Sequence, residues 1–161
     1  MSQFGTGSFG SAVFGGDPTP YLLLSVDAEM TYRARQLMAR GSTDGTSLQM
    51  QQFTVGQGGF DPFNYRVALP VNPDATALID PYFTDTIDQY EHPNPRNACA
   101  YCLLEYTEAN VTLGEIGIWS EIQCSPIATE NGTMFLSHIA HFPLIAKNDS
   151  MRIALRVLSQ F

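Results

Sequence analysis

The stretch Met151-Arg152-Ile153-Ala154-Leu155-Arg156-Val157-Leu158 decides the fold class. Its odd-numbered residues are all apolar, whereas its even-numbered residues include both arginines. Side chains alternate between the two faces of a strand, so this pattern predicts a strand with one buried face and the arginine pair on the outer face. A strand of this kind belongs to an antiparallel sheet packed on a core.

Upstream of this stretch, most of the chain also has the character of short strands. Strands are expected at residues 48–55, 99–108, 111–114, 115–120 and 133–141, the last opened by the turn Asn131-Gly132. Between residues 60 and 98, helices and central strands are excluded by six prolines: Pro62, Pro70, Pro73, Pro81, Pro93 and Pro95. We expect a long insert with short edge strands there, and such excursions are usually functional or interfacial.

One helix is predicted, over about residues 27–40, after a short strand at residues 21–26. Its apolar face is formed by Met30, Ala34, Leu37 and Met38. Asp27 and Gly41 are the expected N-cap and C-cap. The predicted fold is therefore mainly β (α+β), an antiparallel β-sandwich-like domain with one N-terminal helix and an extended N-terminal arm.

Residues 1–20 differ from the rest of the chain. They contain five glycines and a single charge, and the pair Phe-Gly recurs at a spacing of five, with Phe4, Phe9 and Phe14. No helical or strand period fits this segment. Aromatic side chains on a glycine-rich backbone suit a docking arm that fills hydrophobic pockets of a neighbouring subunit; the alternative is a disordered tail with accidental spacing. The domain organisation is thus an arm (residues 1–20) and one β-rich domain (residues 21–161).

The charge balance excludes some partners. The net charge is -8, and the eight Lys and Arg residues form no run, so binding to nucleic acid or to an anionic membrane is not expected. No apolar run is long enough to span a membrane, and no signal-peptide pattern precedes Arg33, so synthesis in the cytoplasm is expected. Charged residues are only 15% of the chain, which favours a surface that other subunits partly cover.

The sequence does not predict an enzyme, a cofactor or a metal site. Cys99 and Cys102 are three residues apart in an expected strand, so they point to opposite faces and do not share one zinc ion. His138 and His141 are separated in the same way. The sequence contains no phosphate-binding motif and no pairing that suggests a catalytic base.

The region of residues 28–161 resembles the N-terminal module of bacteriophage tail-fibre and tail-collar fibre proteins. The matching motifs occur in the same order: a helix, the loop Phe53-Thr-Val-Gly-Gln-Gly-Gly59, the box Gly114-Glu115-Ile116-Gly117-Ile118-Trp119, the turn Asn131-Gly132-Thr133, and His141-Phe142-Pro143 before a last strand. The Phe-Gly arm has no counterpart in the family. Fibres of the family also continue far beyond this module.

The resemblance implies a virion protein that docks on tail, neck or baseplate subunits and forms a cyclic homo-oligomer. It also implies structural roles for Glu115, Gly117, Trp119, Phe142 and Pro143. Glu115 is expected to satisfy backbone donors within the fold. Trp119 is expected to be either an interface anchor or a half-buried side chain on a central strand.

Four aromatic residues of the insert form a second candidate interface: Tyr65, Tyr82, Phe83 and Tyr90. Aromatic side chains gathered on one face also suit glycan binding. The alternative function is therefore that of a small carbohydrate-binding β-sandwich protein.

Overall fold

The computed structural model describes residues 22–160, and the N-terminal arm with Phe4, Phe9 and Phe14 lies outside them. The strands are β1 (Leu22–Met30), β2 (Ser47–Gly56), β3 (Phe60–Asp61), β4 (Asn64–Ala68), β5 (Pro81–Thr86), β6 (Gln89–Asn94), β7 (Asn97–Leu104), β8 (Thr112–Cys124), β9 (Met134–Ala146) and β10 (Ile153–Gln160). Helix α1 (Tyr32–Asp44) follows β1, and a short 3-10 helix, η1 (Ala128–Glu130), lies between β8 and β9. The fold is mainly β, as predicted.

Eight strands form one sheet in the order β5-β2-β8-β9-β1-β10-β7-β6, and β3 pairs only with β4. The prediction of an antiparallel sheet is wrong at one point, because β1 and β10 run parallel, from the pair Leu22 and Ile153 to the pair Ala28 and Ser159. The sheet is therefore mixed. Alternation of side chains identifies a strand but carries no information on the direction of its neighbours.

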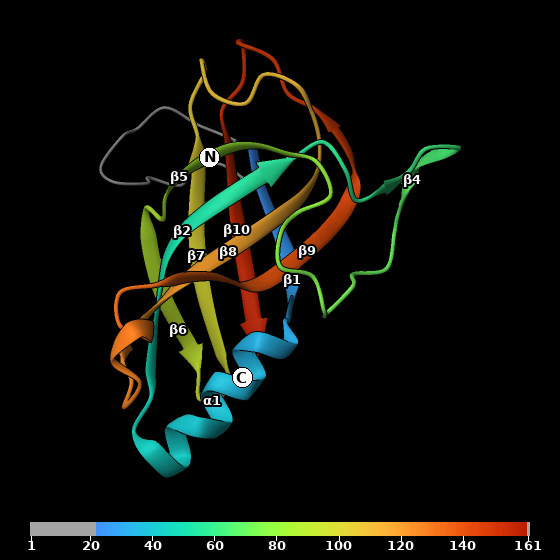
Figure 1. Cartoon of the computed structure of the whole chain (residues 1–161). Helices are drawn as coiled ribbons and strands as arrows, with labels where there is room; N and C mark the ends of the chain where they lie inside the picture. Colours follow the sequence, from blue (N-terminus) through green and yellow to red (C-terminus); the bar gives the residue numbers. More distant parts are fainter. Residues whose placement is uncertain (1–21, 161) are drawn as a thin grey trace.

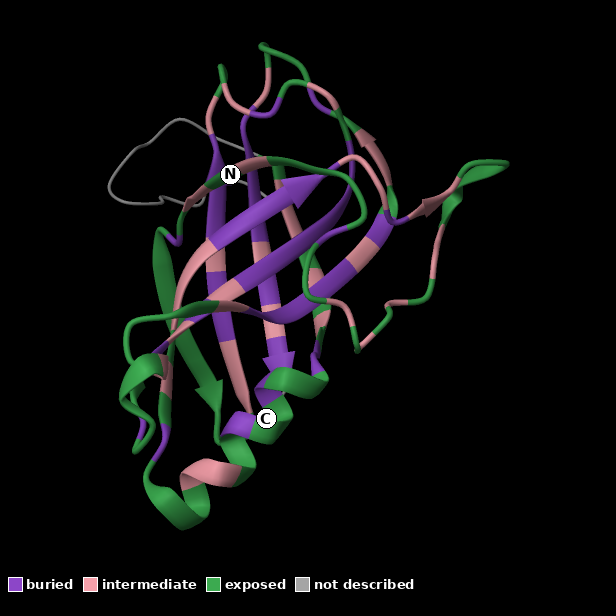
Figure 2. Ribbon diagram, in the orientation of Figure 1, coloured by how far each residue is buried: buried purple, intermediate pink, exposed green. Residues whose placement is uncertain are grey.

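The sheet folds over so that its two halves face one another. Strand β1 pairs with β10 over most of its length and with β9 only at Glu29 and Met30, which makes the corner. In Figure 1, β2, β8 and β9 cross in front of β7, β10 and β1. Side chains from both halves form one core cluster, including Phe53, Ile118 and Leu155, and the buried residues lie between the halves in Figure 2.

The two edge strands of the sheet, β5 and β6, are consecutive in the chain. Only Ile87 and Asp88 lie between them, and both donate backbone hydrogen bonds: Ile87 to Gln51 O (3.2 Å) and Asp88 to Tyr101 O (3.0 Å). The predicted short edge strands of the insert are confirmed. The same segment thus borders both halves of the folded sheet.

Arg152, directly before β10, and Arg156, in β10, are not both exposed to solvent. Arg152 is buried, with its guanidinium bound to both carboxylate oxygens of Glu105 (2.8 and 3.1 Å). Arg156 is half-buried and donates to the Tyr101 hydroxyl (3.1 Å). The predicted alternation is observed, because Ile153, Leu155 and Val157 belong to the main core. Arg152 is nevertheless buried, because its partner comes from a loop 47 residues away in sequence.

Helix α1 begins and ends later than predicted. Its N-cap is Thr31, whose hydroxyl accepts from Ala34 N (3.2 Å) and donates to Leu136 O (2.8 Å). Gly45 ends the helix with φ 81°. The predicted caps, Asp27 and Gly41, are wrong because residues 27–30 continue β1. No helix in the described part of the chain is long and apolar enough to cross a membrane.

Candidate functional site

The carboxylate of Glu115 organises the insert. Glu115 lies on β8 with no exposed surface. Its Oε2 accepts hydrogen bonds from Gly58 N (3.0 Å) and Asp80 N (2.8 Å), and its Oε1 accepts from Ile79 N (2.9 Å). The predicted role of Glu115 as an acceptor for backbone donors is therefore confirmed. One buried carboxylate therefore binds both ends of the segment between β2 and β5: Gly58 at its start and Ile79 and Asp80 at its end.

Glycines let the backbone approach this carboxylate. A Cβ atom at Gly58 would lie 2.8 Å from Glu115 Oε2. A Cβ atom at Gly59 would fall on the carbonyl oxygen of Gly114, and Gly59 has φ 90°, a conformation that favours glycine. The loop of residues 56–59 therefore crosses directly over β8, which explains why both segments are rich in glycine.

His141 closes the same site from β9. Its Nδ1 lies 2.9 Å from Leu69 O, and because a carbonyl only accepts, Nδ1 carries the proton. Its Nε2 lies 4.0 Å from Glu115 Oε1. His141 thus ties the end of the β3–β4 segment to the strand that faces Glu115.

The other residues of the tail-fibre-like motifs lie in the framework. A Cβ atom at Gly117 would lie 2.7 Å from the Leu136 side chain. Trp119 is half-buried, packs on the cluster that contains Leu136, and donates from Nε1 to Thr54 Oγ1 (3.0 Å). The expected half-buried position of Trp119 on a central strand is observed, and its role as an interface anchor stays a prediction.

Phe142 and Pro143 have different environments although they are adjacent. Phe142 is buried in the main core cluster. Pro143 is exposed and lies where the register of β8 and β9 shifts, between the pairs Leu113–Ile145 and Glu115–His141. A proline is tolerated at such an irregularity because no ladder hydrogen bond is needed from it.

A projecting hairpin is the most exposed apolar feature of the described residues. It is formed by β3 and β4 and extends away from the sheet in Figures 1 and 2. Phe63, at its tip, is 97% exposed, and Tyr65 and Val67 on β4 are 56% and 46% exposed. The hairpin is fixed at its base, where Leu69 N donates to Gly59 O (2.8 Å). Sequence reasoning did not single out Phe63, although the turn Asp61-Pro62-Phe63-Asn64 marks a tip.

The four aromatic residues of the insert do not lie together. Tyr65 is on the hairpin, and β5, which carries Tyr82 and Phe83, lies on the opposite side of the molecule (Figure 1). Tyr82 is 55% exposed, whereas Phe83 packs against the main core. Tyr90, on β6, donates from its hydroxyl to Met50 O (2.7 Å) and so joins the two halves of the sheet. These residues therefore do not form one aromatic face.

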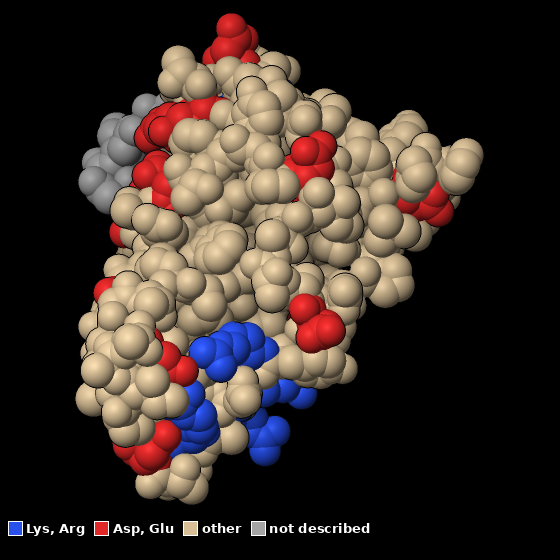
Figure 3. Space-filling view, in the orientation of Figure 1, with Lys and Arg blue, Asp and Glu red and all other residues tan. Residues whose placement is uncertain are grey.

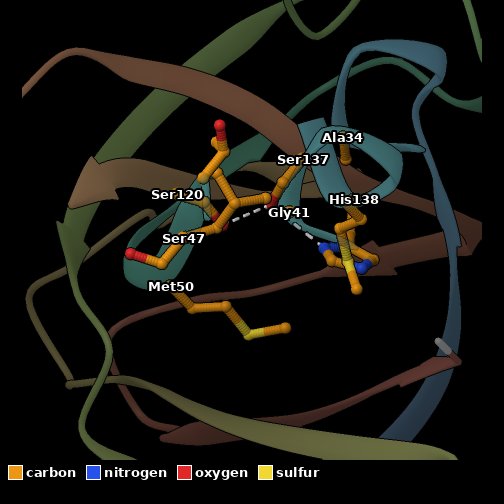
Figure 4. A pocket seen from close by; sticks show the side chains of 10 residues that line it. Ala34, Gly41, Ser47, Met50, Ser120, Ser137 and His138 are labelled. Atoms are coloured by element: carbon orange, nitrogen blue, oxygen red, sulfur yellow. Dashed lines mark hydrogen bonds between the residues drawn. The ribbon is translucent and has the colours of Figure 1, made fainter. Parts of the chain in front are cut away.

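A cavity of about 350 Å³ lies between α1 and the sheet. Its lining comes from α1, β2, β8 and β9 and the residue before β2: Ala34, Met38, Gly41, Thr46, Ser47, Leu48, Met50, Ser120, Ser137 and His138. Figure 4 shows Ser120, Ser137 and His138 joined along one side, with Met50 on another. None of the lining residues is an acid, a lysine or an arginine.

The polar groups of this cavity are organised around the Ser137 hydroxyl. It donates to Ile118 O (3.0 Å) and lies 2.7 Å from Ser120 Oγ and 3.0 Å from His138 Nδ1. In this arrangement the Ser137 hydroxyl donates to a backbone carbonyl and not to His138 Nδ1. Burial lowers the pKa of His138 to about 4, so the imidazole is neutral near pH 7.

Helix α1 is fixed over the cavity by an ion pair. Arg40 donates to both carboxylate oxygens of Glu130 (3.1 and 2.9 Å), and Ser125 Oγ donates to Glu130 Oε1 (2.6 Å). The Arg40 guanidinium lowers the pKa of Glu130 to about 2. Figure 3 shows that the Lys and Arg side chains of the visible face gather at the end where α1 lies. Sequence reasoning missed this pair, because its members lie 90 residues apart.

The cysteines of β7 are buried thiols. Cys102 shares the main core with Ala100 and Leu104, two residues before and after it, so Cys99 lies on the other face. Burial raises the pKa of both thiols. Within residues 22–160, no group of three His, Cys, Asp or Glu side chains is arranged to hold a metal ion.

Comparison with models of protein families and with curated proteins finds no match to this chain.

Proposed function

We propose that this chain is a structural docking protein of a tailed-bacteriophage particle, an adaptor of the tail, collar or baseplate or a fibre-attachment module. The observation that carries the proposal is the anchored hairpin with Phe63 at its tip. A two-stranded hairpin has no core of its own. A phenylalanine held this far from the core contributes nothing to folding, but it can fill a hydrophobic pocket of a neighbouring subunit.

The Glu115 site supports the proposal because it makes the projection rigid at its base. Hydrogen bonds to a buried carboxylate are stronger than those between neutral groups. A loop that is already held in place loses less conformational entropy when it binds a partner. Glu115 belongs to the segment that resembles the tail-fibre and collar-fibre module, so the resemblance and the geometry point to the same part of the chain.

The facing halves of the sheet support the finer classification as a β-sandwich, in which two inner faces share one core. The partners we propose are tail, neck or baseplate subunits of the virion and further copies of this chain. A hairpin or arm that contacts a different surface of the next copy makes a heterologous contact, and repetition of that contact gives a ring if the rotation between copies closes. A cyclic homo-oligomer within the particle is the arrangement we infer.

Incorporation into particles tests the proposal. We expect Phe63→Ser, and separately deletion of residues 1–16, to leave the protein folded but to reduce its amount in purified particles, measured by quantitative mass spectrometry. The matched control is Tyr32→Ser, which removes a 57% exposed aromatic side chain from α1, away from the hairpin. Normal incorporation of both altered proteins would refute the docking role.

Carbohydrate binding remains the alternative proposal, and one feature favours it. Trp119 borders an open depression of about 310 Å³, which Gln52, Thr54 and Thr84 also line. An aromatic ring beside amide and hydroxyl groups suits a sugar. Binding on a glycan array that Gln52→Ala abolishes and Phe63→Ser leaves intact would support this alternative instead of the docking role.

A further inference from the structure

We infer that the N-terminal arm of this chain packs on the outer face of the half-sheet β1–β10–β7 of the same subunit. The outer face is the side of these strands that points away from the main core, and its apolar residues are Leu23, Cys99, Tyr101, Leu103, Ala154 and Leu158. The inference goes beyond the proposed function, because it concerns the isolated subunit.

The outer face follows from the alternation of side chains along β10. Alternate residues from Ile153 to Val157 belong to the main core, so Ala154 and Leu158 point to the opposite side. Leu103 and Cys99 of β7 pair with these two residues and share their side. This half of the sheet lies behind β2, β8 and β9 in Figure 1, so its outer face points away from the viewer.

The outer face is more buried than the open face of a sheet. Cys99 and Ala154 have no exposed surface, and Leu103 is 8% exposed. The solvated face of an antiparallel sheet normally carries polar side chains that water reaches. The low exposure of these three apolar side chains therefore indicates a further layer over the strands.

The hydrophobic clusters indicate that this layer comes from outside residues 22–160. Leu103 and Ala154 form a small cluster with Leu23 and Tyr101, and all four belong to the three strands themselves. The other half of the sheet also has a cluster outside the main core, but there Leu78 of the insert packs on the sheet. The insert thus covers one half, and the N-terminal arm is the segment that adjoins the other.

The arm joins the domain at the edge of the outer face. Leu22 donates from its backbone N–H to Arg152 O (3.0 Å), and Leu23 is a member of the cluster. The face extends about 13 Å along β10 and about 10 Å across the three strands. The eight residues from Phe14 to Leu22 span up to about 29 Å, so every phenylalanine of the arm can reach it.

This tether selects the chain's own arm over that of a second copy. A segment joined by a short linker has an effective concentration in the millimolar range, which free copies of the protein do not match. The composition of the arm also fits, because residues 1–20 carry three phenylalanines and a single charge. Exchange of arms between copies in a ring keeps the same contacts, so the inference is compatible with the proposed oligomer.

Thiol labelling tests the inference, because the three cysteines have different environments. Cys124 is exposed, Cys102 belongs to the main core and Cys99 lies on the outer face. In the full-length protein we expect iodoacetamide to modify Cys124 alone, as measured by peptide mass spectrometry. Combined replacement of the three arm phenylalanines by serine should speed the modification of Cys99 by about tenfold or more, while Cys102 stays protected.

The control replaces three serines of the arm and keeps its aromatic rings: Ser2→Ala, Ser8→Ala and Ser11→Ala. Cys99 should remain protected in this variant and, in the unaltered protein, at every protein concentration. Equal labelling rates of Cys99 in the two variants overturn the inference. Protection of Cys99 that is lost on dilution assigns the face to a second copy and also overturns it.

A photo-cross-link locates the arm without removal of its aromatic character. The residue p-benzoylphenylalanine replaces Phe4, Phe9 or Phe14 singly in the full chain. At one or more of these positions, irradiation should give a product of monomer mass that is joined to residues 97–104 or 153–158. A product of doubled mass, attachment to other segments only, or no product overturns the inference. This measurement also decides the case in which the phenylalanine variant unfolds and exposes Cys102.

The inference and the proposed function fail separately. If Cys99 is labelled equally in the two variants while Phe63→Ser still lowers incorporation into particles, the arm does not cover the outer face and the docking function stands. If Cys99 is labelled as expected but neither Phe63→Ser nor deletion of residues 1–16 affects incorporation, the arm covers the face and the docking function is refuted.

Discussion

Replacement of Glu115 by glutamine probes the group that holds the insert to the sheet. The substitution keeps the size of the side chain and one acceptor oxygen. If that oxygen takes the place of Oε2, the hydrogen bonds from Gly58 and Asp80 remain. The new amide NH2 group then faces the N–H of Ile79, which donates to Oε1 in the native protein at 2.9 Å. The glutamine NH2 group and the Ile79 N–H are then two donors that face each other, without an acceptor, in a site with no exposed surface.

The magnitude follows from these contacts. A buried donor left unsatisfied costs about 1–3 kcal/mol, and the two remaining hydrogen bonds each lose the advantage of a charged acceptor, about 1 kcal/mol apiece. These contributions sum to about 3–5 kcal/mol, and we expect Glu115→Gln to lower the free energy of unfolding by at least the lower value, about 3 kcal/mol. This is a large part of the roughly 5–15 kcal/mol that stabilises an ordinary protein.

Urea unfolding followed by tryptophan fluorescence measures the effect directly. The chain has a single tryptophan, Trp119, which packs beside Leu78 of the segment that Glu115 holds. With a slope of about 2 kcal/mol per M, the midpoint should fall by about 1.5 M urea. The control is Glu121→Gln on the same strand, where the carboxylate is half-exposed and a change within about 0.5 kcal/mol is expected. Equal midpoints for the two variants would refute the role assigned to Glu115.

Three further predictions concern pH and backbone conformation. Burial lowers the pKa of His138 from 6.5 to about 4, so the unfolded state binds a proton before the folded state does as the pH falls. The free energy of unfolding, measured by urea titration, should therefore fall by up to about 3 kcal/mol between pH 6.5 and 4. The substitution His138→Gln should remove this pH dependence. The pKa of Glu130 is lowered from 4.5 to about 2, so its ion pair with Arg40 stabilises the folded state above pH 4.5 and this stabilisation is lost towards pH 2. The substitution Glu130→Gln should therefore speed amide hydrogen exchange in α1 at pH 7 but not at pH 2. Gly59→Ala should destabilise the protein more than Gly45→Ala in urea unfolding, because both glycines have positive φ but only Gly59 is crowded.

The sequence predicts the strands well because a half-buried strand has a strong local signal. The alternation in residues 151–158 and the apolar run that begins at Cys99 identify β10 and β7. The proline-rich insert is also predictable, since proline is tolerated at edges and excluded from central strands. The role of Glu115 could be predicted because a carboxylate within an apolar strand needs donors around it.

Features that depend on distant residues could not be predicted in this way. The predicted start of α1 is too early because Met30 fits a helical face as well as a strand, and only the pairing of β1 with β9 and β10 decides between them. Arg152 is buried because Glu105 reaches it. The hairpin with Phe63 has no hydrophobic period because residues 62–67 are all exposed. The cavity between α1 and the sheet is lined by four separate elements, so no single segment of the sequence predicts it.

The parallel pairing of β1 with β10 has a mechanical consequence. A partner that grips the segment before Leu22 transmits its pull to the start of β1, and the seven residue pairs from Leu22–Ile153 to Ala28–Ser159 resist together. When tension acts along the strands, the ladder is loaded in shear, so no pair can yield before the others. Strand β1 also ends at the corner of the sheet, at Glu29 and Met30, and is followed directly by the capped helix α1. The start of β1 is therefore suited to bear tension, a property that the docking role we propose would use.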